Sequence, residues 1–155
     1  MLIVGCGCRG RALAERLAET GHAVRGTTRD PARTAAIEAA GAEAVVADPG
    51  RLATLLPQLA GVSAVCWLLA SAERAPELHG DRLQSFMERL VDTPVRGVVY
   101  EAAGSADGEV LAGGAAIVRE ASEVWRIPVE VVEEDRGSPK WVPAMMGAVT
   151  RLLER

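Results

Sequence analysis

The chain has 155 residues, of which 49% are apolar and 25% are charged, and its formal net charge is −4. This length predicts one domain, residues 1–155, with a core large enough to need no disulfide or metal. The longest apolar stretch, Ala64–Ala70, is too short to span a membrane, and the acidic balance argues against a nucleic-acid partner. No secretory signal is visible and the three cysteines are an odd number, so we expect a cytoplasmic protein.

Short β-branched runs alternate with segments of helical periodicity through the first half of the chain. Asp30 and Pro31 are typical of a helix start, with a capping carboxylate before proline at the first helical position. A glycine follows each expected helix, where a C-terminal cap belongs. The expected elements are strand Met1–Val4, helix Arg11–Thr20, strand His22–Thr28, helix Pro31–Ala40, strand Ala44–Ala47 and helix Leu52–Leu59.

The second half continues the same alternation. Its first strand is apolar nearly throughout, which is typical of a central strand covered on both faces. The expected elements are strand Val62–Leu69, helix Asp81–Val91, strand Val95–Tyr100, helix Asp107–Arg126, strand Pro128–Val132 and helix Lys140–Leu153. Strict alternation of six strands and six helices predicts the α/β class, with a doubly wound, mostly parallel six-stranded sheet and helices on both faces.

Three of the later helices carry apolar stripes that indicate their buried faces. In the last helix the stripe is richer than covering a sheet requires, so core packing, a lid over a cleft and a homodimer contact all remain open. The stripes are Leu83, Phe86, Met87 and Leu90, then Val110, Ile117, Ala121 and Val124, and finally Trp141, Met145, Val149 and Leu152.

The clearest motif is the glycine cluster Gly5-Cys6-Gly7-Cys8-Arg9-Gly10. It follows a strand and opens a helix, the context in which G-x-G-x-x-G binds a dinucleotide. Gly5 permits the tight turn, Gly7 lets the backbone approach a diphosphate, and Gly10 allows close packing of helix and strand. The backbone N–H groups around Cys8 and Arg9 then face the phosphates at the positive end of the helix dipole.

The end of the second strand bears on which dinucleotide is bound. NAD sites place an acid there for the ribose hydroxyls, whereas NADP sites supply an arginine for the 2′-phosphate. Thr28 occupies the acid position, and Arg29 can pair with the phosphate, with Arg33 as a second cation. This pattern favours NADP over NAD; the alternative is a solvated Arg29 and an Asp30 that contacts the ribose.

Other cofactor contacts are expected after the third and fourth strands, since ligands of open α/β sheets bind at the carboxyl ends of the strands. Asp48 follows the third strand, where such folds meet the adenine, and it could also cap the next helix. Leu69, Ala70 and Ser71 follow the fourth strand, near the point where the strand order reverses.

These residues resemble the short-chain dehydrogenase/reductase superfamily, in particular its atypical, extended-type members. The similarity lies in Leu2–Gly7, the helix Arg11–Leu17, Gly21–Val24 and Gly26–Arg29, and covers about the first 70 residues. It implies a Rossmann fold with NAD(P) at Gly5, Gly7, Gly10, Arg29 and Asp48.

The sequence departs from that family at its catalytic Tyr-x-x-x-Lys dyad. The single tyrosine is Tyr100, position 104 is glycine, and the single lysine is Lys140. Other groups near the same sheet edge that could donate a proton are Glu101, Ser105 and His79. None of them has a partner residue at a spacing that would tune its pKa. Tyr100 is more often a strand residue with a satisfied hydroxyl, and His79 is more often a loop residue beside a turn glycine.

Two further features have plain interpretations. Cys6 and Cys8 could be redox-active, because thiols at helix N-termini can have a lowered pKa, but they are better read as small residues that fill the turn. No metal-ligand spacing is present, and the charged run Glu133–Arg136 is expected to be solvated. We therefore expect an NADP(H)-binding domain that works as a binding or sensing module. The alternative is an oxidoreductase or epimerase-like enzyme with a non-standard proton donor or a partner subunit.

Overall fold

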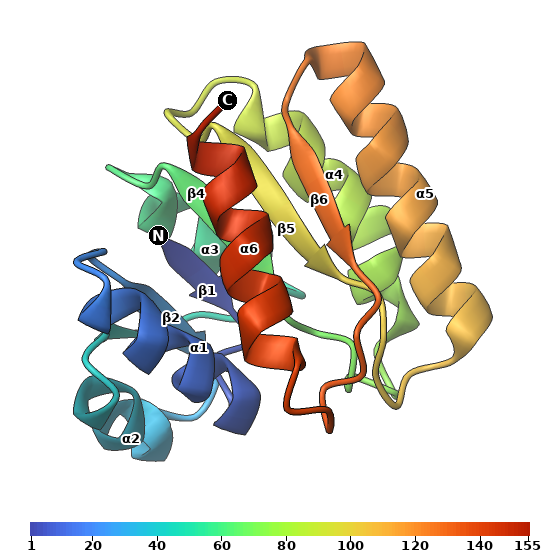
Figure 1. Ribbon diagram of the computed structural model, residues 1–155. Helices are drawn as coiled ribbons and strands as arrows, with labels where there is room; N and C mark the ends of the chain where they lie inside the picture. Colours follow the sequence, from blue (N-terminus) through green and yellow to red (C-terminus); the bar gives the residue numbers. More distant parts are fainter.

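The computed structural model describes residues 1–155, and its six strands form one parallel sheet in the order β3-β2-β1-β4-β5-β6 (Figure 1). The chain builds β1 to β3 outward on one side and then crosses back to lay β4 beside β1. The strands are β1 Leu2–Val4, β2 Arg25–Thr28, β3 Glu43–Val46, β4 Ala64–Trp67, β5 Gly97–Glu101 and β6 Val129–Val132. The doubly wound fold is therefore confirmed, and all strand pairs are parallel.

Helices cover both faces of this sheet. On one face α1 and α6 lie side by side, and α4 and α5 cover the other face (Figure 1). The α-helices are α1 Cys8–Glu19, α2 Thr34–Ala39, α3 Leu52–Leu55, α4 Asp81–Leu90, α5 Gly108–Trp125 and α6 Trp141–Leu153. Short 3-10 helices are η1 Pro31–Arg33, η2 Leu56–Leu59 and η3 Pro76–His79. None of the helices combines the length and the apolarity needed to cross a bilayer.

The second and third helices differ from their predicted form. Asp30 caps the chain as expected, its carboxylate accepting from the Ala32 N–H at 2.9 Å, but the first turn is a 3-10 helix before α2 begins. The third helix is one α-turn followed by a second 3-10 turn, η2, which contains Pro57. Proline has no N–H to donate and its ring crowds the carbonyl four residues back, so a regular helix cannot continue through it.

The buried face of α5 matches the prediction only in part. Ala121 is buried and Ile117 packs against the core as predicted, but Val124 is 62% exposed. The buried residues of the helix are Leu111, Gly114, Ala115, Val118 and Ala121. The reason is the close approach of β5, because a Cβ on Gly114 would overlap the hydroxyl of Tyr100. Contact with that large side chain, rather than apolar content, decides which side of this glycine- and alanine-rich helix turns inward.

The last helix buries its predicted stripe. Trp141, Met145, Val149 and Leu152 are at most 1% exposed and pack with α1 and the sheet in one of the two main cores. The apolar surface that suggested a lid or a homodimer contact is thus used inside the molecule.

Candidate functional site

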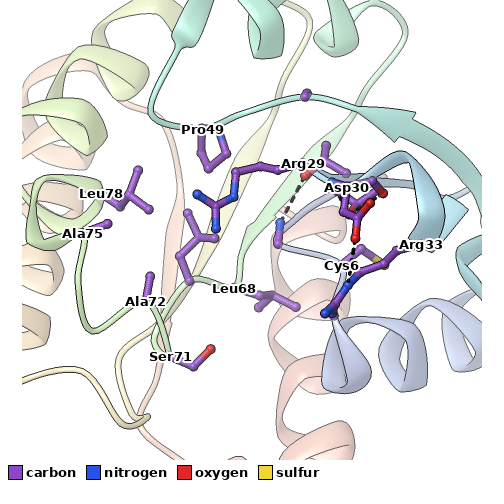
Figure 2. A pocket seen from close by; sticks show the side chains of 16 residues that line it. Cys6, Arg29, Asp30, Arg33, Pro49, Leu68, Ser71, Ala72, Ala75 and Leu78 are labelled. Atoms are coloured by element: carbon purple, nitrogen blue, oxygen red, sulfur yellow. Dashed lines mark hydrogen bonds and ion pairs between the residues drawn. The ribbon is translucent and has the colours of Figure 1, made fainter.

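A cleft of about 420 Å³ opens at the carboxyl edge of the sheet, where β1 and β4 are adjacent and the strand order reverses (Figure 2). Open α/β sheets bind their ligands at this position. Sixteen residues line it: Gly5, Cys6, Gly7, Thr27, Thr28, Arg29, Asp30, Arg33, Ala47, Pro49, Leu68, Leu69, Ser71, Ala72, Ala75 and Leu78.

The turn after β1 has a conformation and a packing that require its glycines. Gly5 has φ +84°, and a Cβ there would lie 2.6 Å from the carbonyl oxygen of Leu68. Gly10 is packed against the Gly5 carbonyl oxygen, which a Cβ would approach to 3.0 Å. Gly7, in contrast, faces open space, and a Cβ added there would meet no atom within 4 Å. The three glycines thus have the geometry expected for a tight turn, a close helix contact and an open backbone surface.

The first turn of α1 presents free backbone donors beside this open surface. Gly7 is the N-cap and has no side chain to cap the helix, and the first turn contains no acidic residue. The N–H groups of Cys8, Arg9 and Gly10 have no backbone or side-chain acceptor. Such a turn suits an anionic group, so the chain's own geometry fits a diphosphate at this place.

Thr27 holds the turn from the neighbouring strand and was missed by sequence reasoning. Its hydroxyl accepts from the Gly5 N–H at 3.2 Å, and its carbonyl accepts from the Cys6 N–H at 2.9 Å. Thr27 itself is 1% exposed. A buried threonine at a strand end has no distinctive sequence signal, since its partners come from a turn 22 residues earlier.

The two cysteines of the turn have different surroundings. Cys6 is buried and packs over Gly26, where a Cβ would lie 2.7 Å from its sulfur. Burial raises the pKa of the Cys6 thiol to about 11, which is the opposite of an activated thiol. Cys8 is exposed at the start of α1. For Cys6, the structure supports the small packing residue rather than a redox group.

The end of β2 supplies the polar side of the cleft. Arg29 extends its guanidinium into the cleft in Figure 2 and has neither an ion-pair nor a hydrogen-bond partner. Arg33 also lines the cleft, with its side chain directed toward Cys6 in Figure 2, and it forms a 3.8 Å ion pair with Asp30. The hydroxyl of Thr28 bonds the backbone of Asp30 within the same turn. Two arginines and one aspartate line the cleft, so its charged groups sum to +1.

Asp48 and Ala70, both expected at the cofactor, do not line the cleft, and neither does the side chain of Arg9, whose backbone N–H was the expected contact. The Asp48 carboxylate accepts from the Gly50 N–H at 2.9 Å, while the N-cap of α3 is Arg51. Ala70 is fully buried beneath the cleft surface. The Arg9 side chain turns away, and its guanidinium carbon lies 4.9 Å from the centre of the Trp141 ring. The turn at Gly50 holds the side chain of Asp48, and Trp141 at the start of α6 holds that of Arg9.

The residues after β4 form the other side of the cleft. We call this segment, residues 68–72, the cleft wall. Four of its residues line the cleft: Leu68, Leu69, Ser71 and Ala72. Sequence reasoning placed Leu69 and Ser71 here and missed Ala72, Ala75 and Leu78, which arrive with the loop and η3. A polar loop of small residues gives no signal that it folds back over a sheet edge.

His79 and Tyr100 form a buried pair behind the cleft wall. His79 Nδ1 lies 2.7 Å from the Tyr100 hydroxyl, and Nε2 lies 2.9 Å from the Leu69 carbonyl oxygen. Because the carbonyl can only accept, Nε2 carries the proton, and Nδ1 of the neutral ring accepts from Tyr100. Burial lowers the pKa of His79 and raises that of Tyr100, so both are neutral near pH 7.

Glu101 and Arg136 form a second buried group, on the opposite face of the sheet. Glu101 is 0% exposed, and Arg136 binds both of its carboxylate oxygens at 2.8 Å. Burial raises the pKa of Glu101, and Arg136 offsets part of this effect. The indole N–H of Trp141 also lowers the pKa of Glu101. Arg136 is thus not part of a solvated run, because a carboxylate 35 residues earlier draws it inward.

Most candidate proton donors are therefore hydrogen-bonded within the protein, away from the cleft. Tyr100, Glu101 and His79 are at most 2% exposed and bonded within the protein, and none of them lines the cleft. Ser105 is exposed and also lies outside the cleft lining. The one hydroxyl side chain that lines the cleft wall is Ser71.

A family model described as NAD(P)H-binding matches residues 5–126. No curated protein is significantly similar to the chain in sequence. The match includes the glycine turn, the end of β2, the cleft wall and α5, and leaves α6 and the segment before it outside.

Solved structures with the same fold include reductases and an epimerase. Vestitone reductase from alfalfa is 16% identical with TM-score 0.67, over 85% of this chain and 55% of that one. Triphenylmethane reductase from Citrobacter sp., complexed with NADP(H), is 16% identical with TM-score 0.66, over 86% and 48%. UDP-glucuronic acid 4-epimerase from Bacillus cereus, complexed with NAD, is 14% identical with TM-score 0.64, over 85% and 55%. The chain thus spans about half the length of these proteins, and the last two differ in the nucleotide they hold.

Proposed function

Because the chain belongs to the NAD(P)H-binding family, we propose that its cleft binds NADP(H) in preference to NAD(H). The diphosphate would lie on the free N–H groups at the start of α1, beside Gly7. The adenosine ribose would lie at the end of β2, and the nicotinamide half would extend along the cleft wall.

The observation that carries the preference is the unpaired Arg29. Its guanidinium lies in the cleft beside Thr28, at the strand end where an NAD site would supply an acid. A phosphate on the ribose 2′-oxygen would give this cation a partner, and Arg33, which lines the same cleft, would add a second positive charge. Asp30, the one acid of the cleft, already caps η1 and faces Arg33.

Fluorescence titration with NADPH and NADH tests this proposal. Arg29→Ala should weaken NADPH about tenfold or more, the scale of one charge-assisted contact to a phosphate, and leave NADH nearly unchanged. The matched control is Arg89→Ala, which removes an exposed arginine near the end of α4, away from the cleft. Equal loss of both nucleotides in Arg29→Ala, or wild-type protein that prefers NADH, would refute the 2′-phosphate assignment.

We further propose that dinucleotide binding is itself the task of this domain, as a binding or sensing module. The support is the state of the single tyrosine, because its hydroxyl is buried and bonded to His79 rather than directed into the cleft. The Lys140 side chain stands at the exposed start of α6. Neither residue is placed to serve as the proton-donating dyad of the short-chain dehydrogenases.

The second candidate function is an NAD(P)-dependent oxidoreductase or epimerase-like activity that uses another donor or a partner subunit. It is favoured by the reductase and epimerase neighbours and by Ser71, a hydroxyl group on the cleft wall. Loss of NADPH absorbance with a panel of carbonyl and quinone compounds would support this function. Tight NADPH binding without turnover across the panel would favour the module.

A further inference from the structure

The cleft wall is held from both faces of the sheet by consecutive residues of one strand. Tyr100 and Glu101 end β5, and successive side chains of a strand point to opposite faces. On the α4–α5 face, Tyr100 bonds His79, which in turn bonds the cleft wall. On the α1–α6 face, Glu101 bonds the cleft wall directly. We propose that His79 and Glu101 are positioning residues that set the cleft wall for the nicotinamide half of the bound dinucleotide. This inference rests on the proposed NADP(H) function.

His79 and Glu101 bind the two ends of one peptide group of the wall, and a third contact fixes the next peptide group. The Leu69 carbonyl accepts from His79 Nε2 at 2.9 Å, and the Ala70 N–H donates to Glu101 Oε2 at 3.4 Å. The Ala70 carbonyl accepts from the Ala106 N–H at 2.8 Å, and Gly104 packs on it so closely that a Cβ would overlap it. Both carbonyls and the intervening N–H are therefore fixed between two cleft-lining residues, Leu69 and Ser71.

The wall in turn touches the phosphate-binding turn. A Cβ on Gly5 would lie 2.7 Å from Leu69 Cδ2 and 2.6 Å from the Leu68 carbonyl oxygen. A shift of Leu69 would therefore change the apolar surface offered to a flat ring, while the turn at Gly5 stays held by Thr27, which accepts from the Gly5 and Cys6 N–H groups. The end of β2, with Arg29 and Arg33, has no hydrogen bond to His79 or Glu101. The effect of these two residues should thus be confined to the nicotinamide side.

Both holders are fixed in position by a second partner. His79 is neutral, with one ring nitrogen donating to the wall and the other accepting from Tyr100. Glu101 has Arg136 on both oxygens, so its carboxylate cannot rotate freely. His79 with Tyr100 on one face, and the buried Glu101 held by the half-buried Arg136 on the other, give the loop a fixed geometry that fully exposed side chains could not provide.

Two substitutions at one position separate positioning from general stability. Asparagine at 79 places its amide near the Nδ1 position and keeps a partner for Tyr100, but it cannot reach the Leu69 carbonyl. Glutamine places its amide near the Nε2 position and keeps the bond to Leu69. His79→Asn and His79→Gln should therefore cost similar stability, while only His79→Asn releases the cleft wall.

The readouts are the dissociation constants of NADPH and of adenosine 2′,5′-bisphosphate, which lacks the nicotinamide half, and the emission maximum of bound NADPH. His79→Asn should weaken NADPH about fivefold and shift the emission, with the bisphosphate within about twofold of wild type. His79→Gln should match wild type on all three. Equal losses in the two variants, or equal losses of the two ligands, would overturn the inference.

A second pair tests the opposite face and covers the case in which His79→Asn fails to fold. Glu101→Gln keeps an acceptor for the Ala70 N–H, whereas Glu101→Met removes it at similar volume. Weaker NADPH in Glu101→Met alone, with the bisphosphate unchanged, supports the inference, and unchanged NADPH in both variants overturns it. If the wild-type protein binds neither ligand, the proposed function itself fails, so the two failures are distinct.

Discussion

The two sides of the cleft are built in opposite ways. On the β2 side, Arg29, Asp30 and Arg33 are exposed side chains from one short stretch of sequence, and their contacts are local. On the β4 side, the lining is largely apolar and its backbone is fixed by buried groups from distant elements. Exposed charges can be exchanged at little cost in stability, so the first side can set nucleotide preference. The second side sets geometry, and changes there affect the whole fold.

The largest effect is expected where the two sides meet, at Gly5. Gly5→Ala forces a residue with a Cβ into φ +84° and against the Leu68 carbonyl, so it should lower the free energy of unfolding by about 3 kcal/mol. Gly7→Ala is the matched control, because Gly7 has φ −80° and open space around it. That variant should keep its stability within about 1 kcal/mol and lose NADPH affinity at least about tenfold.

Urea unfolding and NADPH titration of both variants measure these effects. A stable Gly5→Ala would mean that the two sides are not packed as described. A Gly7→Ala protein with wild-type affinity would contradict a diphosphate at the start of α1.

A smaller effect is expected in the pH dependence of folding stability, which should come from the buried groups on the β4 side of the cleft. The pKa of His79 is lowered in the folded state, so the unfolded chain takes up a proton first as the pH falls through about 6.5. Stability from this residue is therefore complete above that pH and is lost as the pH falls toward the folded pKa. The raised pKa of Glu101 acts in the opposite direction, with its contribution lost as the pH rises through the folded pKa.

Comparison with His79→Gln isolates the histidine, since Glu101 titrates in both proteins. Urea unfolding at pH 7.5 and 5.5 should show a larger loss of stability for wild type than for the variant. Identical losses would show that His79 is not held neutral behind the cleft wall.

The smallest effect concerns thiol accessibility. Cys8 is exposed on the phosphate side, whereas Cys6 and Cys66 are buried, with pKa values raised to about 11 and about 12. A disulfide reagent should label one thiol quickly in the folded protein and the other two only on unfolding. Cys8→Ser should abolish the fast phase without changing the slow ones, and two fast thiols in wild type would contradict the burial of the turn.

Sequence reasoning succeeded where interactions are local. The glycine turn, the Asp30 cap and the stripes of α4 and α6 follow from backbone conformation and periodicity. It was right only in part for the face of α5, and it was wrong for Arg136. In both cases a partner from elsewhere in the fold decided the outcome: Tyr100 against Gly114, and Glu101 for Arg136.

The sequence by itself determined the α/β alternation, the strand count and the glycine turn after β1, because hydrophobic period and glycine conformation act over a few residues. The tertiary structure alone decided how the cleft wall is held, since His79 and Tyr100 are 21 residues apart and Glu101 and Arg136 are 35 apart. These pairs form only in the folded sheet, where β5 places Tyr100 on one face and Glu101 on the other. No local sequence pattern predicts them.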